Sequence, residues 1–134
     1  LEGPQLDYFS NEGVHSFCNT EFKITSLTDR MGMRLEGKKV ELIKSANIKS
    51  EGIIRGSIQV PADGQPIVLL SDHQTIGGYP KIGVVITADY NNLIQILPGN
   101  LIAFRKVNMR EAEISFQLKQ ASLKAMIESI IKIN

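Results

Sequence analysis

Residues 52–71 read GIIRGSIQVPADGQPIVLLS, and this stretch decides the fold class. From Gly52 to Val60 the even-numbered positions form an apolar face, which predicts a strand in which Gly56 marks a bulge or a close backbone approach. Pro61-Ala62-Asp63-Gly64 has the residue types of a tight turn. The unbroken apolar run at 67–70 predicts a second strand that is buried on both faces. The stretch therefore predicts an antiparallel hairpin.

Further short strands are predicted on both sides of this hairpin. Apolar residues alternate with polar ones, or β-branched residues cluster, at 21–25, 33–37, 40–43, 82–88 and 101–107. Many short strands without interleaved helices of crossover length favour an antiparallel sheet that closes on itself over a parallel sheet. We therefore expect a closed or nearly closed β-barrel.

Helical signals are fewer and lie mostly near the two ends. A helical turn is predicted at 10–13, a short helix runs from an Asp89 N-cap to Leu97, and an amphipathic helix follows a capping box formed by Asn108 and Glu111. The sequence thus predicts a mainly β protein. Its antiparallel β-barrel, with one short helix, occupies residues 1–107, and a C-terminal amphipathic helix occupies residues 108–134.

The composition fits a single domain. The chain has 134 residues, with 15 Lys and Arg against 14 Asp and Glu, so no basic surface that would bind nucleic acid or an anionic membrane is expected. Cys18 is the single cysteine, which excludes an intramolecular disulfide and makes a reducing cytoplasm the natural setting. No pattern of a signal peptide or a membrane span is present. Because the chain begins with Leu1, we expect it to be part of a longer protein.

Several common catalytic motifs are absent from the sequence. It contains no phosphate-binding P-loop, no nucleophile elbow and no dinucleotide fingerprint. His15, Cys18 and His73 lack the spacing of a zinc site, so no metal site is predicted. Residues 31–33 read MGM, which lacks the lysine between two methionines that carries biotin, so this chain is not a biotinylated domain.

Residues 72–83 read DHQTIGGYPKIG and concentrate the polar chemistry of the chain between two predicted strands. The candidate substrate-binding residues here are Asp72, Gln74, Thr75 and Tyr79, and the residues that shape the backbone are Gly77, Gly78 and Pro80. Polar loops held by strands commonly carry function, and paired glycines allow a close backbone approach. The alternative is an ordinary polar hairpin.

Arg30 and Gln59 complete the candidate site. The Arg30 guanidinium can clamp a carboxylate or phosphate, with Asp29 to orient it or to act as a base. The alternative for this pair is a surface turn. Gln59 and Gln74 can both donate and accept, as recognition of an amide or lactam requires, and Tyr79 adds an apolar ring with a hydroxyl. The alternative for these three is hydrogen bonding to the backbone of turns.

An ordered set of motifs resembles a known family. The motifs are residues 26–37 (SLTDRMGMRLEG), 51–61 (EGIIRGSIQVP), 64–67 (GQPI) and 72–80 (DHQTIGGYP), with GPQ at 3–5 and LPG at 97–99. They are similar to the allophanate hydrolase subunit 2 family, also called urea amidolyase-related, which includes KipA and the C subunit of the bacterial ATP-dependent 5-oxoprolinase. The resemblance extends to about residue 107 and does not cover the C-terminal helix.

The resemblance implies a cyclophilin-like β-barrel and the C-terminal half of a longer protein. It implies the ATP-dependent opening of 5-oxoproline to glutamate, with ATP used by the complex and no cofactor assigned to this chain. The implied partners are an allophanate hydrolase subunit 1 or KipI-type protein (the B subunit of 5-oxoprolinase) and a protein of the A-subunit type. Two alternatives stay open: a KipA-like regulator that binds a KipI-type kinase inhibitor, and the carboxyltransferase part of a biotin-dependent urea carboxylase.

Two positions depart from the family pattern. His73 stands where the family often has Arg, and Ile76 stands where a second Thr is common. A permanently charged side chain is thereby replaced by one that is mostly neutral at pH 7. We therefore expect Gln74 and Tyr79, not His73, to carry recognition in this loop.

Overall fold

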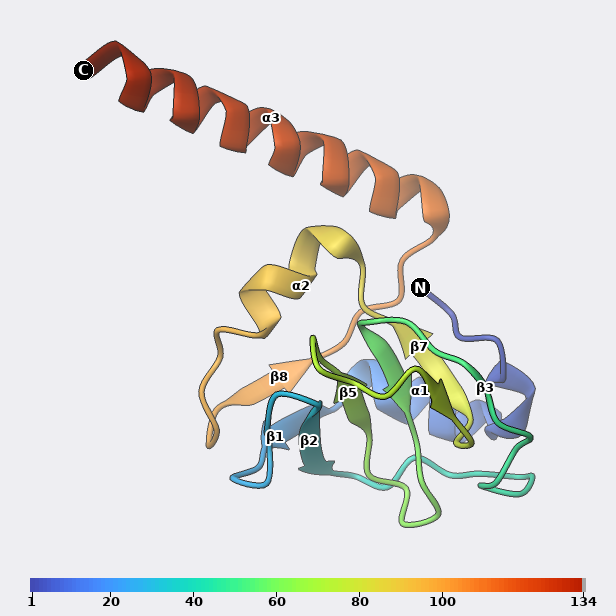
Figure 1. The fold of residues 1–134 in the computed structure, drawn as a ribbon. Coiled ribbons are helices and arrows are strands. Elements are labelled where there is room, and N and C mark those ends of the chain that lie inside the picture. The colour runs from blue at the N-terminus through green and yellow to red at the C-terminus, as the bar shows by residue number, and fades with distance from the viewer. Residues whose placement is uncertain (134) are drawn as a thin grey trace.

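The computed structural model describes residues 1–133, which fold into a half-barrel of short strands with helices around it (Figure 1). Its helices are η1 (Leu6–Tyr8), α1 (Asn11–Asn19), α2 (Thr87–Leu93) and α3 (Met109–Ile133). Its strands are β1 (Glu21–Ile24), β2 (Gly32–Gly37), β3 (Glu51–Gly52), β4 (Ser57–Gln59), β5 (Ile67–Leu69), β6 (Ile76–Gly77), β7 (Lys81–Val84) and β8 (Leu101–Ala103). The predicted mainly β fold, with a short helix and a C-terminal helix, is confirmed.

Two antiparallel sheets make up the β structure. The larger has six strands in the order β7-β4-β5-β2-β1-β8, so β7 and β8 form its two edges. The smaller pairs only β3 with β6, and we call this unit the β3–β6 ribbon. The central hairpin forms as predicted: β4 pairs with β5, and Pro61 accepts a hydrogen bond of 3.0 Å from the Gly64 N–H, with Gly64 at φ +75°.

An aromatic cluster fills one end of the core. The rings of Phe17 and Phe104 stack with centroids 4.6 Å apart, and Phe22 packs at 5.7 Å from Phe17. Phe22 lies on β1 and is fully buried. Residues from α1, β1 and the chain after β8 thus meet at this point, and the cluster joins one edge of the sheet to the helix beneath it.

The strand predicted from Gly52 to Val60 was wrong in extent. Only Ser57–Gln59 is a strand of the large sheet, and the alternation fails because Ile53 is buried whereas Ile54 is exposed. Gly56 interrupts the run: it has φ +85°, and the Ile54 carbonyl accepts a hydrogen bond of 3.1 Å from the Ser57 N–H. A Cβ at Gly56 would lie 3.2 Å from the Val85 carbonyl oxygen, so the close backbone approach expected there is real.

Four other predicted boundaries were also wrong. Residues 40–43 form a single bridge between Leu42 and Phe9 instead of a strand. Helix α2 begins at Thr87, and its N-cap residue is Ile86 instead of Asp89, without a side-chain hydrogen bond. The strand predicted at 82–88 ends at Val84, because the chain enters this helix soon afterwards. The last strand stops at Ala103. Val40, Ile86 and Val107 in these segments are buried although they lie outside strands, so burial alone does not extend a strand.

The predicted capping box at the start of α3 is confirmed. The Glu111 N–H donates to the Asn108 side chain at 2.9 Å, and the Asn108 N–H donates to the Glu111 carboxylate at 2.8 Å. Lys119 ties the helix to α2 by donating to the Ala88 carbonyl at 2.6 Å. Beyond α2 the helix extends away from the sheet (Figure 1). Among residues 1–133, none of the helices combines the length and the apolar character of a membrane-spanning segment.

We predict that Phe22→Ala lowers the free energy of unfolding by about 3–5 kcal/mol, because it leaves a cavity in the aromatic cluster. Phe116→Ala is the matched control, since Phe116 lies on α3 and is 42% exposed. Urea denaturation monitored by circular dichroism measures both variants. Equal losses of stability in the two variants would contradict this account of the core.

Candidate functional site

The loop at 72–83 is more ordered than a plain hairpin. Its residues 76 and 77 form β6, which pairs with β3 in the register Glu51↔Gly77 and Gly52↔Ile76. Two further backbone hydrogen bonds extend this pairing, from the Ile53 N–H to the Thr75 carbonyl at 3.1 Å and from the Ile48 N–H to the Gly78 carbonyl at 2.8 Å. The loop is therefore held as one side of the β3–β6 ribbon.

Arg30 and Asp72 form an ion pair on the surface. The Arg30 Nε lies 2.8 Å from Asp72 Oδ2, and both side chains are exposed. Asp29 has a structural role instead: its carboxylate accepts hydrogen bonds from the N–H groups of Met31 and Gly32, and these bonds lower its pKa. The pair of Arg30 and Asp72 thus joins the turn before β2 to the start of the loop.

Gln74, Thr75 and Tyr79 present their side chains at the surface. Gln74 and Thr75 are exposed, and Tyr79 is 40% exposed. Within residues 1–133 none of these three side chains makes a hydrogen bond, although the Thr75 carbonyl accepts from the backbone of Ile53. Their amide and hydroxyl groups are therefore available to a ligand or to a partner protein.

Gln59 is separated from these exposed residues. It lies on β4 opposite Lys81 of β7, and only 2% of it is exposed. Gly77 covers its carboxamide so closely that a Cβ added to Gly77 would lie 2.6 Å from Gln59 Nε2. Within the described residues this nitrogen has no hydrogen-bond partner. Gln59 thus lies under the β3–β6 ribbon with an unused donor.

Three residues that we did not predict complete this buried position. Lys81, 4% exposed, forms an ion pair with Glu51, whose side chain is 41% exposed. Gln5 donates from Nε2 to Glu51 Oε1 at 2.7 Å and accepts at Oε1 from the Lys81 N–H at 3.1 Å. The Lys81 ammonium, followed by the Gln5 carboxamide, lowers the pKa of Glu51. We call Gln5, Glu51, Gln59 and Lys81 the buried polar cluster.

A signal for this cluster was present in the sequence. Lys81 is a charged residue directly before the apolar run of β7, and Gln5 belongs to the GPQ motif near the N-terminus. A lysine in a buried strand requires a counter-charge, because an unpaired buried ammonium is costly. Only the three-dimensional pairing identifies Glu51 as its partner.

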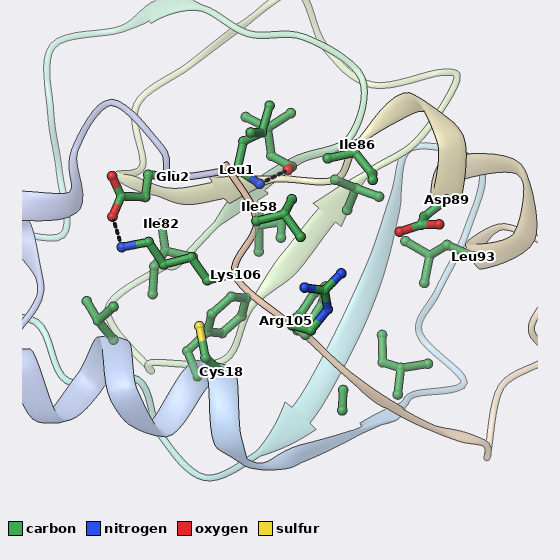
Figure 2. A pocket seen from close by; sticks show the side chains of 18 of the residues that line it. Leu1, Glu2, Cys18, Ile58, Ile82, Ile86, Asp89, Leu93, Arg105 and Lys106 are labelled. Carbon is green, nitrogen blue, oxygen red and sulfur yellow. Dashed lines mark hydrogen bonds and ion pairs between the residues drawn. The ribbon is translucent and has the colours of Figure 1, made fainter. Parts of the chain in front are cut away.

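An apolar cavity of about 460 Å³ lies between the two edges of the half-barrel (Figure 2). Residues of α1, α2, β7 and β8 line it, including Cys18, and Lys106 contacts Glu2 at its rim. None of the site residues predicted from the sequence lines this cavity. The candidate site is therefore the 72–83 loop with the buried polar cluster beneath it.

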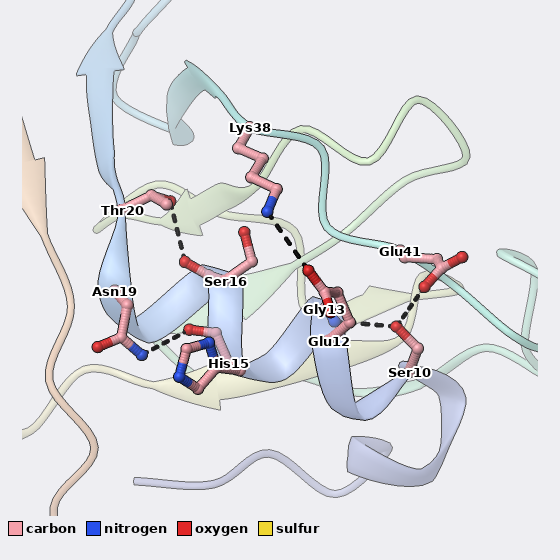
Figure 3. Close-up of polar contacts among 9 residues, drawn as sticks. All are labelled: Ser10, Glu12, Gly13, His15, Ser16, Asn19, Thr20, Lys38 and Glu41. Carbon is pink, nitrogen blue, oxygen red and sulfur yellow. Dashed lines mark hydrogen bonds and ion pairs between the residues drawn. The ribbon is translucent and has the colours of Figure 1, made fainter.

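Polar contacts around α1 stabilise the helix and form no second site (Figure 3). Ser10 accepts from the Gly13 N–H at 2.9 Å as the N-cap, and Lys38 pairs with Glu12 at 3.6 Å. The His15 side chain is exposed. Among residues 1–133, no group of three His, Cys, Asp or Glu side chains is arranged to hold a metal ion.

Comparison with known proteins defines the class. Residues 1–106 match the family described as carboxyltransferase domain, subdomain A and B, and the chain belongs to this family. This confirms the relationship to the urea amidolyase-related proteins that the sequence motifs indicated.

The similar proteins include C subunits of 5-oxoprolinase and a urea amidolyase. The chain is 41% identical to the C subunit of 5-oxoprolinase from Haemophilus influenzae and 38% identical to that from Escherichia coli, over 84% of this chain and 36% of each relative. The crystal structure of the K. lactis urea amidolyase superposes with a TM-score of 0.81 at 25% identity, over 87% of this chain and 8% of that one. The chain thus spans about a third of the length of the curated 5-oxoprolinase relatives.

We predict that Gly77→Ala lowers the free energy of unfolding by about 1–3 kcal/mol, because its methyl group would press on Gln59. Gly52→Ala in the paired strand is the matched control, with an expected change within about 0.5 kcal/mol, since its Cβ would meet nothing within 4 Å. Adding Gln59→Ala to Gly77→Ala relieves the clash. The double variant should therefore lose less unfolding free energy than the sum of the losses in the two single variants. Equal effects of the two alanines in thermal or urea unfolding would contradict the close approach.

Glu51→Gln tests the ion pair through pH. The pKa of Glu51 is lower in the folded chain, so its carboxylate stabilises the fold fully above the unfolded pKa of about 4.3 and loses this effect as pH falls through the folded pKa. The stability difference between wild type and Glu51→Gln should therefore be largest near about pH 7 and shrink as the pH falls below about 4.3. Glu36→Gln, at an exposed position, should show little difference at either pH. A pH-independent difference would contradict the assignment.

Proposed function

We propose that this chain is part of a protein of the 5-oxoprolinase C-subunit type, which acts with partner subunits to open the lactam of 5-oxoproline to glutamate at the expense of ATP. The observation that carries this proposal is the 41% and 38% identity to two bacterial 5-oxoprolinase C subunits. Because the chain spans 36% of these relatives, the activity belongs to the longer protein and its complex. A cytoplasmic location fits the use of ATP.

The exposed groups of the loop are proposed to contact the substrate or a partner protein. Gln74 and Thr75 offer donors and acceptors for a small amide, and Tyr79 offers a ring with a hydroxyl. The Arg30 and Asp72 pair lies beside them and can exchange one of its partners for a ligand group of the same charge. Gly77 allows the ribbon to lie against Gln59, the Gly78 carbonyl accepts from the Ile48 N–H within the ribbon, and the Pro80 carbonyl accepts from the Val60 N–H at 3.0 Å, so the ends of the loop are held in place.

ATP and the remaining chemistry are proposed to belong to the partner subunits. The sequence contains no phosphate-binding loop. The partners are an allophanate hydrolase subunit 1 or KipI-type protein, equivalent to the B subunit of 5-oxoprolinase, and a protein of the A-subunit type. No cofactor is assigned to this chain.

A second candidate is the carboxyltransferase part of a biotin-dependent urea carboxylase. The superposition on the K. lactis urea amidolyase favours it. Both substrates are small amides, so the same exposed groups fit either reaction. The two candidates differ in substrate: 5-oxoproline carries a carboxylate, whereas urea is neutral.

We predict that the full-length protein containing this chain, co-expressed with its B-type and A-type partner subunits, releases glutamate from 5-oxoproline only when ATP is present. Gln74→Ala and Tyr79→Phe should each lower kcat/KM about tenfold, equivalent to the loss of about one hydrogen bond in the transition state. The matched controls are Gln117→Ala on α3 and Tyr8→Phe, whose ring lies 5.0 Å from the Lys44 ammonium.

A complex that assembles but releases no glutamate would contradict the proposed reaction. If it instead carboxylates urea in the presence of carboxybiotin, the second candidate is supported. Unchanged kcat/KM in both loop variants would show that the loop is purely structural.

A further inference from the structure

The buried polar cluster has the composition of a carboxylate site that is already filled from within the chain. The Glu51 carboxylate accepts a hydrogen bond of 2.7 Å from Gln5 and is ion-paired with Lys81. The neighbouring Gln59 Nε2 has no partner among residues 1–133. Gln5 and Lys81 thus contact the Glu51 carboxylate from two separate segments, and Gln59, which lies opposite Lys81, places its Nε2 beneath Gly77 of the same ribbon.

Strand pairing fixes this arrangement. Gln59 lies opposite Lys81 in the β4–β7 ladder, and Glu51 lies opposite Gly77 in the β3–β6 ribbon. Gly77 in turn lies directly over Gln59 Nε2. The donors belong to the rigid sheet and the N-terminal segment, whereas the carboxylate belongs to the ribbon that covers them.

The carboxylate is the member that can leave. Glu51 is 41% exposed, whereas Lys81 is 4% exposed, so solvent reaches the site from the side of Glu51. Each strand of the β3–β6 ribbon has two residues, and isolated two-stranded ribbons are only marginally stable. Displacing Glu51 moves its charge into water, where a carboxylate is well solvated.

We propose that Lys81, Gln5 and Gln59 form a binding site for a small carboxylate, and that Glu51 occupies this site as an intramolecular stand-in until a ligand displaces it. This inference deepens the proposed function and rests on it for the ligand's identity, since 5-oxoproline carries both a carboxylate and a lactam carbonyl. The carboxylate replaces that of Glu51 on Lys81, and the carbonyl accepts from Gln59 Nε2 once the ribbon, whose Gly77 covers this nitrogen, moves away from the sheet.

Charge selects a carboxylate over other ligands. A monoanion that replaces Glu51 keeps the buried Lys81 neutralised, whereas a neutral amide such as urea would leave its ammonium unpaired. A phosphate dianion would bring one more negative charge than Lys81 can balance. A second acceptor on the ligand satisfies the Gln59 donor, which Glu51 leaves unused, and this extra hydrogen bond favours the ligand over Glu51.

Binding at this site also couples to the exposed loop. Glu51 and Gly77 face each other in the ribbon, and the segment that contains Gly77 also carries Gln74, Thr75 and Tyr79. Release of Glu51 from Lys81 removes a contact that ties this segment to β7. The ligand at Lys81 thereby determines where the loop side chains lie.

The test is to titrate the 134-residue chain separately with 5-oxoproline, acetate, urea and inorganic phosphate, without ATP or partner subunits. Binding is measured from the changes in NMR chemical shifts. We expect wild type to bind 5-oxoproline with a Kd of about 1 mM. Glu51→Gln should lower this Kd about tenfold, because the internal competitor is lost, and Lys81→Gln should raise it at least tenfold. Asp7→Asn, which breaks the exposed pair with Lys44, is the matched control and should not change it.

Gln59→Leu keeps the approximate size of the side chain but removes its hydrogen-bond donor. This second variant tests the site even if Lys81→Gln does not fold. It should raise the Kd for 5-oxoproline about fivefold and leave that for acetate unchanged, since acetate has no second acceptor group to reach Gln59. Equal affinity in wild type and Glu51→Gln, binding of urea or phosphate as tight as that of 5-oxoproline, or no carboxylate binding in either protein would overturn the proposal. Because the titration needs no partners, its failure and a failure of glutamate release by the complex are separate results.

Discussion

The contact between the buried Lys81 ammonium and the Glu51 carboxylate connects the six-stranded sheet to the ribbon that carries the proposed binding loop. Lys81 belongs to the edge strand β7 of the six-stranded sheet, and Glu51 belongs to the small ribbon that carries the exposed loop. A buried ammonium requires an anion beside it, so the ribbon must stay over the sheet unless another anion takes the place of Glu51. Gln5 reinforces the contact from the N-terminal segment. The position of the loop is thus set by electrostatics as well as by strand pairing.

The fold was predictable wherever local chemistry and burial agree. The turn at 61–64 forms because Gly64 takes a positive φ. The capping box forms because the side chains of Asn108 and Glu111 each accept a hydrogen bond from the backbone N–H of the other residue. The prediction failed at 52–60 and at 82–88. At 52–60 the backbone turns at Gly56 and the buried residue is Ile53 instead of Ile54, and at 82–88 the chain enters α2 at Thr87. Apolar periodicity therefore does not by itself report strand pairing.

Of the candidate site, only the exposed part could be predicted from the sequence. The 72–83 loop does present Gln74, Thr75 and Tyr79, and Arg30 does reach Asp72. Gln59 was grouped with them but lies beneath the ribbon. The cluster around it escaped prediction because its members are far apart in sequence: 46 residues separate Gln5 from Glu51, and 76 separate Gln5 from Lys81. Such contacts depend on the order of strands in the sheet, which the pattern of a single segment does not contain.

We propose that Lys81 binds the carboxylate of a ligand and that Glu51 occupies this position in the ligand's absence. A crystal structure of the chain with 5-oxoproline tests this role of Glu51 most directly. We predict that the ligand carboxylate lies within hydrogen-bond distance of Lys81 Nζ, that the lactam carbonyl accepts from Gln59 Nε2, and that the Glu51 side chain points to solvent. A structure in which Glu51 stays on Lys81 while 5-oxoproline binds elsewhere would contradict it.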